Sequence, residues 1–375
     1  MKVPILRIPF SEEEITVIKS DIGEILRSGQ LAMGKYVAEF EQRFKGFIGT
    51  DYAVATNSGT SALEIILRAI DVSGGTVIVP TNTFMATATA AVHAGARVTF
   101  TDIDISTLCM DAASLERQLT NETKAVVLVH IGGNISSELN LIRDLCADHH
   151  VPLVEDAAHA HGSTINGVKA GALGEAGAFS FYPTKILTTG EGGMITTNDS
   201  EIYQKAKMLR DHGKSDHNFN VHTEFGYNWR MSEFHAAVGL TQLDKIQWIL
   251  SERRRIAALY GKHLKHALCS PLLLPSFIKS GYYKYIVYLD DSIERETLKS
   301  RLLTEFGVEL TGEVYAQPVH TQPVFAKYPQ TVVWNSETFE NAEEACANHI
   351  CLPLYPGLTD TEVAYVCDSL KEVLS

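Results

Sequence analysis

The sequence lacks the features by which membrane proteins and nucleic-acid-binding proteins are usually recognised. No stretch of its 375 residues approaches the roughly 18 to 20 uninterrupted apolar residues of a membrane-spanning helix, so we expect no membrane association. Positive charge is scarce, since 32 Lys and Arg residues stand against 45 Asp and Glu residues, for a net charge of −13. Binding to nucleic acid depends on basic surface, and we therefore expect no nucleic-acid partner.

Cysteine is also scarce, and its arrangement suits neither a metal site nor a disulfide framework. The six cysteines are scattered without a CxxC pair, which favours buried free thiols. Fourteen histidines are present, but no HExxH motif or similar ligand spacing occurs, so we predict no metal site. The opening "MKVPILRIPFSEEE" lacks the apolar core and cleavage site of a signal peptide, and we expect a cytoplasmic protein.

What the sequence does contain is a regular alternation of strand and helix patterns. A capping box of Ser11 and Glu14 opens an amphipathic helix. Further helices are expected at about 34–48, 60–71, 85–94, 138–149 and 200–212. Short β-branched runs lie at 53–56, 76–80, 97–103, 125–130, 152–156, 176–181 and 193–198. Apolar strands that alternate with helices are typical of an α/β fold with a mainly parallel sheet covered on both faces.

The pattern changes beyond about residue 232. One long helix is predicted over 232–267, followed by a strand at 282–289 and helices at about 294–306 and 360–374. A chain of this length is expected to form two domains. We predict a large α/β domain over residues 1–250 and a small C-terminal α+β domain over residues 251–375.

Ligands of open α/β sheets collect beyond the carboxyl ends of the strands, where this sequence places distinctive residues. "NSGTS" (57–61) opens a helix whose free N–H groups suit a phosphate, although an ordinary helix cap is the commoner reason for such a pattern. Phe84 follows the next strand and either stacks on a flat ligand or packs in the core. Asp156 ends a strand where a buried carboxylate requires a cation or hydrogen-bond donors.

A lysine also stands at the end of an apolar strand. In "FSFYPTKILTTGEGG" (179–193), Lys185 follows a run of apolar and aromatic residues, whereas lysines ordinarily occupy solvated surfaces. Burial lowers the pKa of an amine and supplies the neutral nucleophile that imine formation requires. A phosphate site, a stacking ring, a buried carboxylate and such a lysine together suit pyridoxal 5′-phosphate (PLP), with the carboxylate beside the pyridine nitrogen.

Longer motifs resemble the sugar aminotransferases of the DegT/DnrJ/EryC1/StrS family, which have the fold-type I, aspartate aminotransferase-like fold of PLP-dependent transferases. In chain order these motifs are "NSGTSAL" (57–63), "TFMATATAAVHAGA" (83–96), "VEDAAHAHGS" (154–163), "FSFYPTKILTTGEGGMITTND" (179–199), "RDHG" (210–213), "GYNWRMSEFHAAVGLTQL" (226–243), "GEVYAQPVHTQPVF" (312–325) and "CLPLYPGLT" (351–359). The resemblance implies an enzyme that moves an amino group from glutamate or glutamine to a keto-sugar by a ping-pong mechanism. The keto-sugar is expected to be linked to a nucleoside diphosphate.

The resemblance also implies roles for individual residues. Lys185 resembles the catalytic lysine that binds PLP covalently, and Asp156 resembles the partner of the pyridine nitrogen. The remaining cofactor-binding residues that it implies are Gly59, Thr60, Phe84, His159, Ser180 and Asn228. In relatives the residue corresponding to Asn228 reaches the phosphate from the neighbouring subunit, which implies a homodimer with shared active sites.

Two further residues in these motifs are candidate substrate contacts. Arg230 either binds the carboxylate of the amino donor or forms an ion pair at the surface. His320 either touches the sugar or completes a turn. The sequence alone leaves both pairs of alternatives open.

Two segments depart from the family's usual pattern. His159 stands where relatives usually have glutamine beside the 3-oxygen of PLP; histidine can donate the same hydrogen bond but adds a titratable group. "IGGN" (131–134) replaces an aromatic–glycine segment that faces the substrate in relatives. Because the loops at 131–136, 214–225 and 311–323 are expected to select the acceptor, the sequence does not identify the sugar.

Three other functions remain as alternatives. A few family members are dehydratases, but they carry histidine where this chain has Lys185. A non-catalytic regulatory protein that keeps the fold is expected to lose Lys185 or Asp156, and both are present. A dinucleotide oxidoreductase requires a GxGxxG motif after the first strand, which is absent here.

Overall fold

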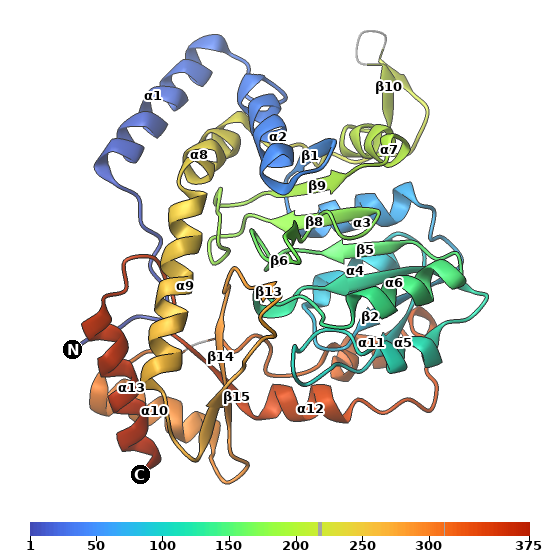
Figure 1. The fold of residues 1–375 in the computed structure, drawn as a ribbon. Coiled ribbons are helices and arrows are strands. Elements are labelled where there is room, and N and C mark those ends of the chain that lie inside the picture. Colours follow the sequence, from blue (N-terminus) through green and yellow to red (C-terminus); the bar gives the residue numbers. More distant parts are fainter. Residues whose placement is uncertain (217–219, 311) are drawn as a thin grey trace.

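The computed structural model describes residues 1–216, 220–310 and 312–375, and its centre is a seven-stranded sheet (Figure 1). The strand order is β1-β9-β8-β5-β4-β2-β3. The strands are β1 (Tyr52–Thr56), β2 (Thr76–Pro80), β3 (Arg97–Thr101), β4 (Thr123–Val129), β5 (Leu153–Asp156), β8 (Ala176–Ser180) and β9 (Gly193–Thr197). Strand β9 runs antiparallel to both of its neighbours, and the other pairs are parallel. The predicted mainly parallel α/β fold is confirmed, with all seven predicted strands in one sheet.

Helices cover both faces of this sheet. They are α2 (Lys35–Ile48), α3 (Gly59–Ala69), α4 (Met85–His93), α5 (Ala112–Gln118), α6 (Leu139–Asp148), α7 (Ser200–Arg210) and α8 (Glu233–Asp244). Successive side chains of a strand point to opposite faces. In β4, Val126 and Leu128 pack in the core shared with α2, α6 and α8, whereas Val127 packs in the core shared with α3, α4 and α7. Burial on both faces explains why the strands are apolar throughout.

The predicted single helix over 232–267 is wrong, because the chain forms two helices there. Helix α8 ends at Asp244, and α9 (Ile246–His263) begins after Lys245, whose φ of −104° and ψ of 10° interrupt the helical hydrogen bonding. The Lys245 ammonium donates to the Pro9 carbonyl (2.6 Å) and to Glu14 (2.7 Å). These contacts tie the break to the start of α1 (Glu12–Ser28), where the predicted capping box is present.

The C-terminal part of the chain contains a second, smaller sheet. Its order is β12-β14-β15, formed by β12 (Cys269–Pro271), β14 (Tyr285–Leu289) and β15 (His349–Leu352). The helices α10 (Arg295–Phe306), α12 (Glu340–Ala347) and α13 (Asp360–Leu374) belong to this part, and α9 runs alongside α13 (Figure 1). Strand β14 begins three residues later than predicted, since Tyr282 has a φ of 52° that a strand does not accommodate.

Shorter elements complete the fold. They are β6 (Thr164–Ile165), β7 (Val168–Lys169), β10 (Lys214–Asp216), β11 (Val221–His222), β13 (Ile278–Lys279), α11 (Pro323–Lys327), and the 3₁₀ turns η1 (Ile131–Gly133), η2 (Val319–Thr321) and η3 (Pro329–Thr331). Of the loops expected to select the acceptor, residues 217–219 and 311 lie outside the described residues.

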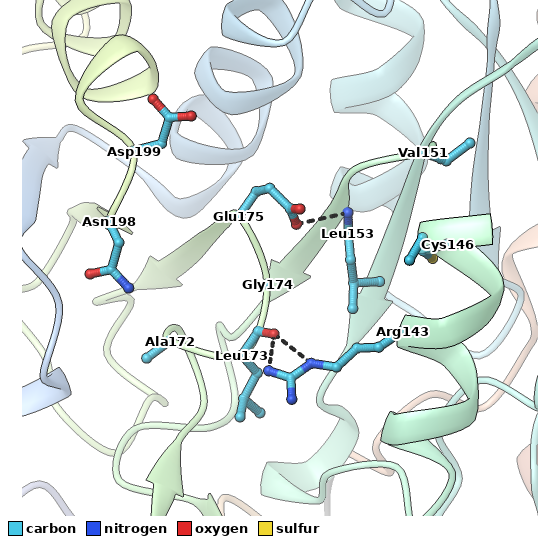
Figure 2. Close-up of a pocket in the computed structure, with 11 residues that line it drawn as sticks. Arg143, Cys146, Val151, Leu153, Ala172, Leu173, Gly174, Glu175, Asn198 and Asp199 are labelled. Atoms are coloured by element: carbon cyan, nitrogen blue, oxygen red, sulfur yellow. Dashed lines mark hydrogen bonds between the residues drawn. The ribbon is translucent and has the colours of Figure 1, made fainter. Parts of the chain in front are cut away.

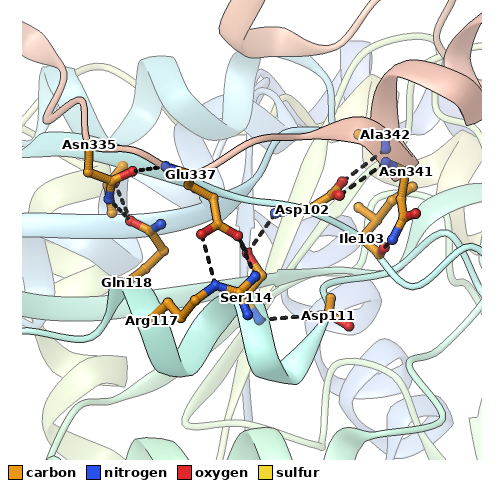
Figure 3. A network of polar contacts seen from close by, with 11 residues as sticks. Asp102, Ile103, Asp111, Ser114, Arg117, Gln118, Asn335, Glu337, Asn341 and Ala342 are labelled. Carbon is orange, nitrogen blue, oxygen red and sulfur yellow. Dashed lines mark hydrogen bonds and ion pairs between the residues drawn. The ribbon is translucent and has the colours of Figure 1, made fainter.

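A segment of the C-terminal half lies against edge strand β3 of the large sheet. The N–H of Val333 donates to the carbonyl of Val98 (2.8 Å), which extends the parallel pairing beyond β3. The Asp102 carboxylate accepts hydrogen bonds from the N–H groups of Asn341 (3.1 Å) and Ala342 (2.9 Å) at the start of α12 (Figure 3). The predicted division after residue 250 falls within α9 and stays a prediction.

Glu337 connects the same segment to α5. Its carboxylate accepts from Ser114 (2.8 Å) and from two nitrogens of Arg117 (2.9 and 2.6 Å), as Figure 3 shows. The hydrogen bonds from Arg117 hold the pKa of Glu337 below its ordinary value of 4.5. The ionised carboxylate is therefore the form that stabilises this contact.

We expect Glu337→Ala to lower the free energy of unfolding by about 1 to 2 kcal/mol, because Ser114 and Arg117 lose their partner. The difference between wild type and variant should be fully present above the ordinary carboxylate pKa. It should shrink as pH falls through the lowered pKa of the folded state. Urea unfolding at several pH values measures both effects. Glu305→Ala, which breaks an exposed pair within α10, is the control and should change stability little.

Two further observations concern the described residues as a whole. None of the helices in this part of the chain combines the length and the apolar composition needed to cross a membrane. Within the same residues, no three His, Cys, Asp or Glu side chains gather as metal ligands. All six cysteines are free and buried, as predicted.

Candidate active site

A cavity of about 490 Å³ lies beyond the carboxyl ends of the parallel strands. Seven of the residues predicted from the sequence line it: Gly59, Thr60, Phe84, Asp156, His159, Ser180 and Lys185. They come from four separate segments of the chain, and the strand order of the sheet brings them together. This position is the one expected for a ligand site in an open α/β sheet.

The start of α3 forms one wall of this cavity. The Ser58 hydroxyl accepts the N–H of Ser61 (3.1 Å), which leaves the N–H groups of Gly59 and Thr60 at the open end of the helix. A Cβ atom on Gly59 would lie 2.8 Å from the Cβ of Ser180. Glycine is therefore required for the helix to start this close to the end of β8.

The two adjacent carboxylates at the end of β5, Glu155 and Asp156, lie in different surroundings. Glu155 is fully buried and accepts from the His130 ring (2.7 Å) and from three backbone N–H groups, at 2.7 to 2.9 Å. Asp156 lines the cavity, where its two oxygens accept from the Thr87 hydroxyl (2.8 Å) and the Ala158 N–H (3.2 Å). Glu155 stabilises the loop that follows β7, whereas Asp156 keeps lone pairs available to a ligand.

Lys185 lies in a turn after β8, with its N–H donating to the Tyr182 carbonyl (2.9 Å). Its Nζ atom is 4.9 Å from the centre of the Tyr283 ring. Burial lowers the pKa of Lys185 below its ordinary value, while Tyr283 and Asp156 act in the opposite direction. The neutral amine is therefore more available here than on a lysine at the surface.

His159 connects the two segments that depart from the family pattern. Its Nδ1 atom accepts the N–H of Gly132 (3.3 Å), which belongs to the "IGGN" segment. Burial is the main reason why the pKa of His159 lies well below its usual value, and the charges of Lys185 and Lys284 lower it further. A neutral ring whose Nδ1 atom accepts a hydrogen bond carries its proton on Nε2. His159 thus faces its surroundings with an Nε2–H donor.

Two aromatic residues of the cavity, Tyr315 and Tyr283, were not identified from the sequence. Phe84 is 60% exposed, and its ring stacks on that of Tyr315 at 6.1 Å and 24°. Tyr283 lines the cavity from the segment before β14. Tyr315 belongs to a motif noted in the sequence, but no pattern in the motif indicates that its ring reaches Phe84. Tyr283 falls within the strand predicted at 282–289, and a strand pattern does not indicate that one of its residues lines a cavity.

Three predicted site residues do not line this cavity. The backbone of Asn228 pairs with that of Asp211, and its side chain is exposed. Arg230 forms an ion pair with the buried Asp211, and its role as a contact for the amino donor stays a prediction. His320 binds the Thr81 hydroxyl through Nδ1 (2.6 Å) and contacts Glu343 through Nε2 (3.2 Å).

A second cavity, of about 580 Å³, lies at the other end of the parallel strands, where β5 and β8 begin. Figure 2 shows Arg143 reaching the carbonyl of Leu173 and Glu175 accepting the N–H of Leu153 (3.1 Å). Cys146 also lines this cavity, but burial raises the pKa of its thiol to about 12, which leaves it unreactive. None of the predicted site residues is among those that line it. The smaller cavity is therefore the candidate active site.

Comparison with known proteins agrees with this geometry. Residues 12–371 match the DegT/DnrJ/EryC1/StrS aminotransferase family. The chain belongs to this family. It is therefore an enzyme of the PLP-dependent aminotransferase class, with the predicted fold-type I architecture.

Individual relatives are similar to this chain over nearly their whole length. GDP-perosamine synthase of Caulobacter vibrioides is 32% identical over 92% of this chain and 91% of its own. DesI, crystallised in the presence of its TDP-sugar product, is 29% identical with a TM-score of 0.88 over 99% of this chain and 93% of its own. Spr1654 from Streptococcus pneumoniae, in its PLP-form, is 27% identical with a TM-score of 0.88 over 100% and 98%.

Proposed function

We propose that this family member uses PLP to move an amino group from glutamate or glutamine to a keto-sugar linked to a nucleoside diphosphate. One observation carries the proposal: Lys185, Asp156 and the open end of α3 line a single cavity. The alternative of a dehydratase has no comparable support, because its members lack the lysine. We retain the expectation that the enzyme works in the cytoplasm.

The residues of the cavity fit PLP. The N–H groups of Gly59 and Thr60 at the start of α3, with Ser180 beside them, suit a phosphate dianion. Asp156 has a hydrogen bond to each oxygen and retains lone pairs for a protonated pyridine nitrogen. Phe84 is exposed enough to stack on a flat ring.

The chemistry that PLP supplies when bound is a covalent link to the donor's nitrogen and an electron sink for the donor's α-carbon. As a neutral amine, Lys185 would hold the cofactor through its aldehyde carbon; once released, it would be the base that moves a proton from the donor's α-carbon to the C4′ carbon of the cofactor. Asp156 holds the proton on the pyridine nitrogen. His159 donates its Nε2–H toward the 3-oxygen, as the resemblance implies for this position.

The substrates are proposed from relatives and from the cavity. GDP-perosamine synthase is named for a nucleotide-linked sugar, and DesI was crystallised in the presence of its TDP-sugar product. Both relatives support an acceptor of that class here. We would incubate the enzyme with ¹⁵N-labelled glutamate or glutamine and a panel of GDP-, TDP- and UDP-linked keto-sugars. A product that carries the labelled nitrogen supports the proposal. Transfer only to keto acids, with none to any keto-sugar, would contradict it.

We further propose a homodimer in which each subunit completes the other's active site. The side chain of Asn228 is exposed and lies outside the cavity of its own chain, although the resemblance places it at the phosphate. Phe225, in the same segment, is 99% exposed, and Tyr227 is 37% exposed. Such an apolar surface beside a predicted site residue is typical of a protein interface.

Mixing two inactive variants tests this shared site. In a dimer of Lys185→Ala and Asn228→Ala subunits, one of the two sites receives both wild-type residues. After unfolding and refolding an equal mixture, we expect about one quarter of wild-type activity, because half of the dimers are mixed and each has one intact site. The control is Lys185→Ala mixed with a chain carrying both substitutions. Activity no higher than the sum of the separate variants would contradict the shared site.

A further inference from the structure

Tyr283 enters the active-site cavity from the C-terminal half of the chain. It lies two residues before the start of β14 and follows Tyr282, whose φ of 52° is unusual for a bulky residue. The N–H of Tyr282 donates to the Ser280 hydroxyl (2.8 Å), and its carbonyl accepts from Arg253 (2.9 Å). These contacts maintain a strained turn, and strained backbone is concentrated at functional sites.

The Tyr283 ring touches two of the predicted site residues at once. The ring of His159 stacks on it with 4.1 Å between centroids and an angle of 22°. The Nζ atom of Lys185 lies 4.9 Å from the same ring centre, within the range of a cation–π contact. The hydroxyl is 3.1 Å from that of Thr184, the residue before Lys185. The ring is therefore fixed at its edge as well as at its face.

The charges around Lys185 come from several elements. Asp156 at the end of β5 and Lys284 before β14 both act on its pKa, in opposite directions, and Glu191 lines the same cavity. His159 and His161 also face it, but burial holds the pKa of both rings well below neutral, with that of His161 at about 3. Both histidines are neutral near pH 7. The Tyr283 hydroxyl is itself titratable: burial acts to raise its pKa, but the charges of Lys185 and Lys284 lower it on balance. The ring face and the ionised hydroxyl of Tyr283 therefore both favour the ammonium form of Lys185.

We propose that Tyr283 is a positioning residue, whose ring holds the free amino group of Lys185 and the imidazole of His159 in the places where each acts on the cofactor. This inference rests on the proposed function, because it takes Lys185 and His159 as the groups that act. The free amino group exists whenever Lys185 is not bonded to the cofactor. In that state an amine on a flexible side chain requires a contact that returns it to the reacting carbon.

The test follows the titration of Lys185 in protein freed of cofactor. Protein at a series of pH values is exposed briefly to an amine-reactive reagent, and mass spectrometry quantifies labelling of the Lys185 peptide. A cation–π contact favours the ammonium, so Tyr283→Leu should move the midpoint of labelling to lower pH by about half to one unit. Tyr283→Phe keeps the ring face but removes the titratable hydroxyl, so it should move the midpoint in the same direction by less than Tyr283→Leu does.

Tyr315→Leu is the matched control. Tyr315 lines the same cavity and stacks on Phe84, but its contact is to His159 rather than to Lys185. Its replacement should leave the Lys185 midpoint unchanged, so a shift in Tyr283→Leu alone supports the proposal. An unchanged midpoint in Tyr283→Leu overturns it. If that variant does not fold, Tyr283→Met fills a similar volume without an aromatic face and carries the same expectation.

The failure of the proposed function would look different. In that case the cofactor would be bonded to another lysine, or to none, in wild-type protein. The labelling midpoints of Lys185 would still report whether Tyr283 holds its amino group. A normal bond of cofactor to Lys185 with no midpoint shift in the Tyr283 variants would overturn the positioning role alone.

Discussion

Lys185→Ala is expected to lose covalently bound PLP and to lower the rate of amino transfer by about a thousandfold or more. The proposed function gives this residue two roles, as the nucleophile that binds the cofactor and as the base that moves the α-proton, and no other lysine lines the described cavity. The first effect is measured by borohydride reduction followed by mass spectrometry, which locates the cofactor on its peptide. The second is measured with labelled donor and a keto-sugar.

Lys19→Ala is the control for this variant, because Lys19 is exposed on α1, on a segment that contributes nothing to the cavity. It should retain both the cofactor and the activity. Covalent cofactor found on Lys185→Ala at the wild-type level would show that a different lysine forms the bond. The assignment of the active site would then be wrong.

Asp156→Asn is expected to keep the covalent bond to PLP but to lower the transfer rate by about a hundredfold to a thousandfold. The amide has nearly the same shape but no charge, so it no longer holds a proton on the pyridine nitrogen, and the electrostatic stabilisation is lost. The same substitution removes a charge that raises the pKa of Lys185. Steady-state kinetics and the borohydride experiment together separate loss of turnover from loss of cofactor.

Asp148→Asn provides the comparison, since Asp148 is an exposed carboxylate at the end of α6. It should leave both measurements unchanged. A rate for Asp156→Asn within a few-fold of wild type would mean that the carboxylate supports the loop after β5 and has no role in the reaction.

The central sheet could be predicted from the sequence because its strands follow a local rule. Strands buried on both faces are apolar at every position, as in Val126, Val127 and Leu128, so their pattern differs from that of the surface helices. The ends of these strands are short segments of sequence. The sequence therefore places Asp156 and Lys185 beyond strand ends, and in the structure both line the same cavity.

The remaining parts depend on contacts between distant segments. Tyr283 and Tyr315 reach the cavity from a part of the chain more than 90 residues beyond Lys185. No local periodicity in the sequence indicates that their side chains line the cavity. The break at Lys245 depends on contacts with Pro9 and Glu14 near the N-terminus. Glu155 and Asp156 are equivalent in sequence pattern, and only the packing of the loop after β7 distinguishes the structural carboxylate from the one in the cavity.

The most direct test of the central claim is the visible absorbance spectrum of the purified protein, recorded before and after adding glutamate or glutamine without an acceptor. We predict a band from PLP bound to Lys185 that disappears when the donor is added, because the cofactor then retains the donor's amino group. A bound chromophore that neither donor changes would contradict the proposed donors. Protein that shows no such band, even after incubation with PLP, would contradict the account of the site as a whole.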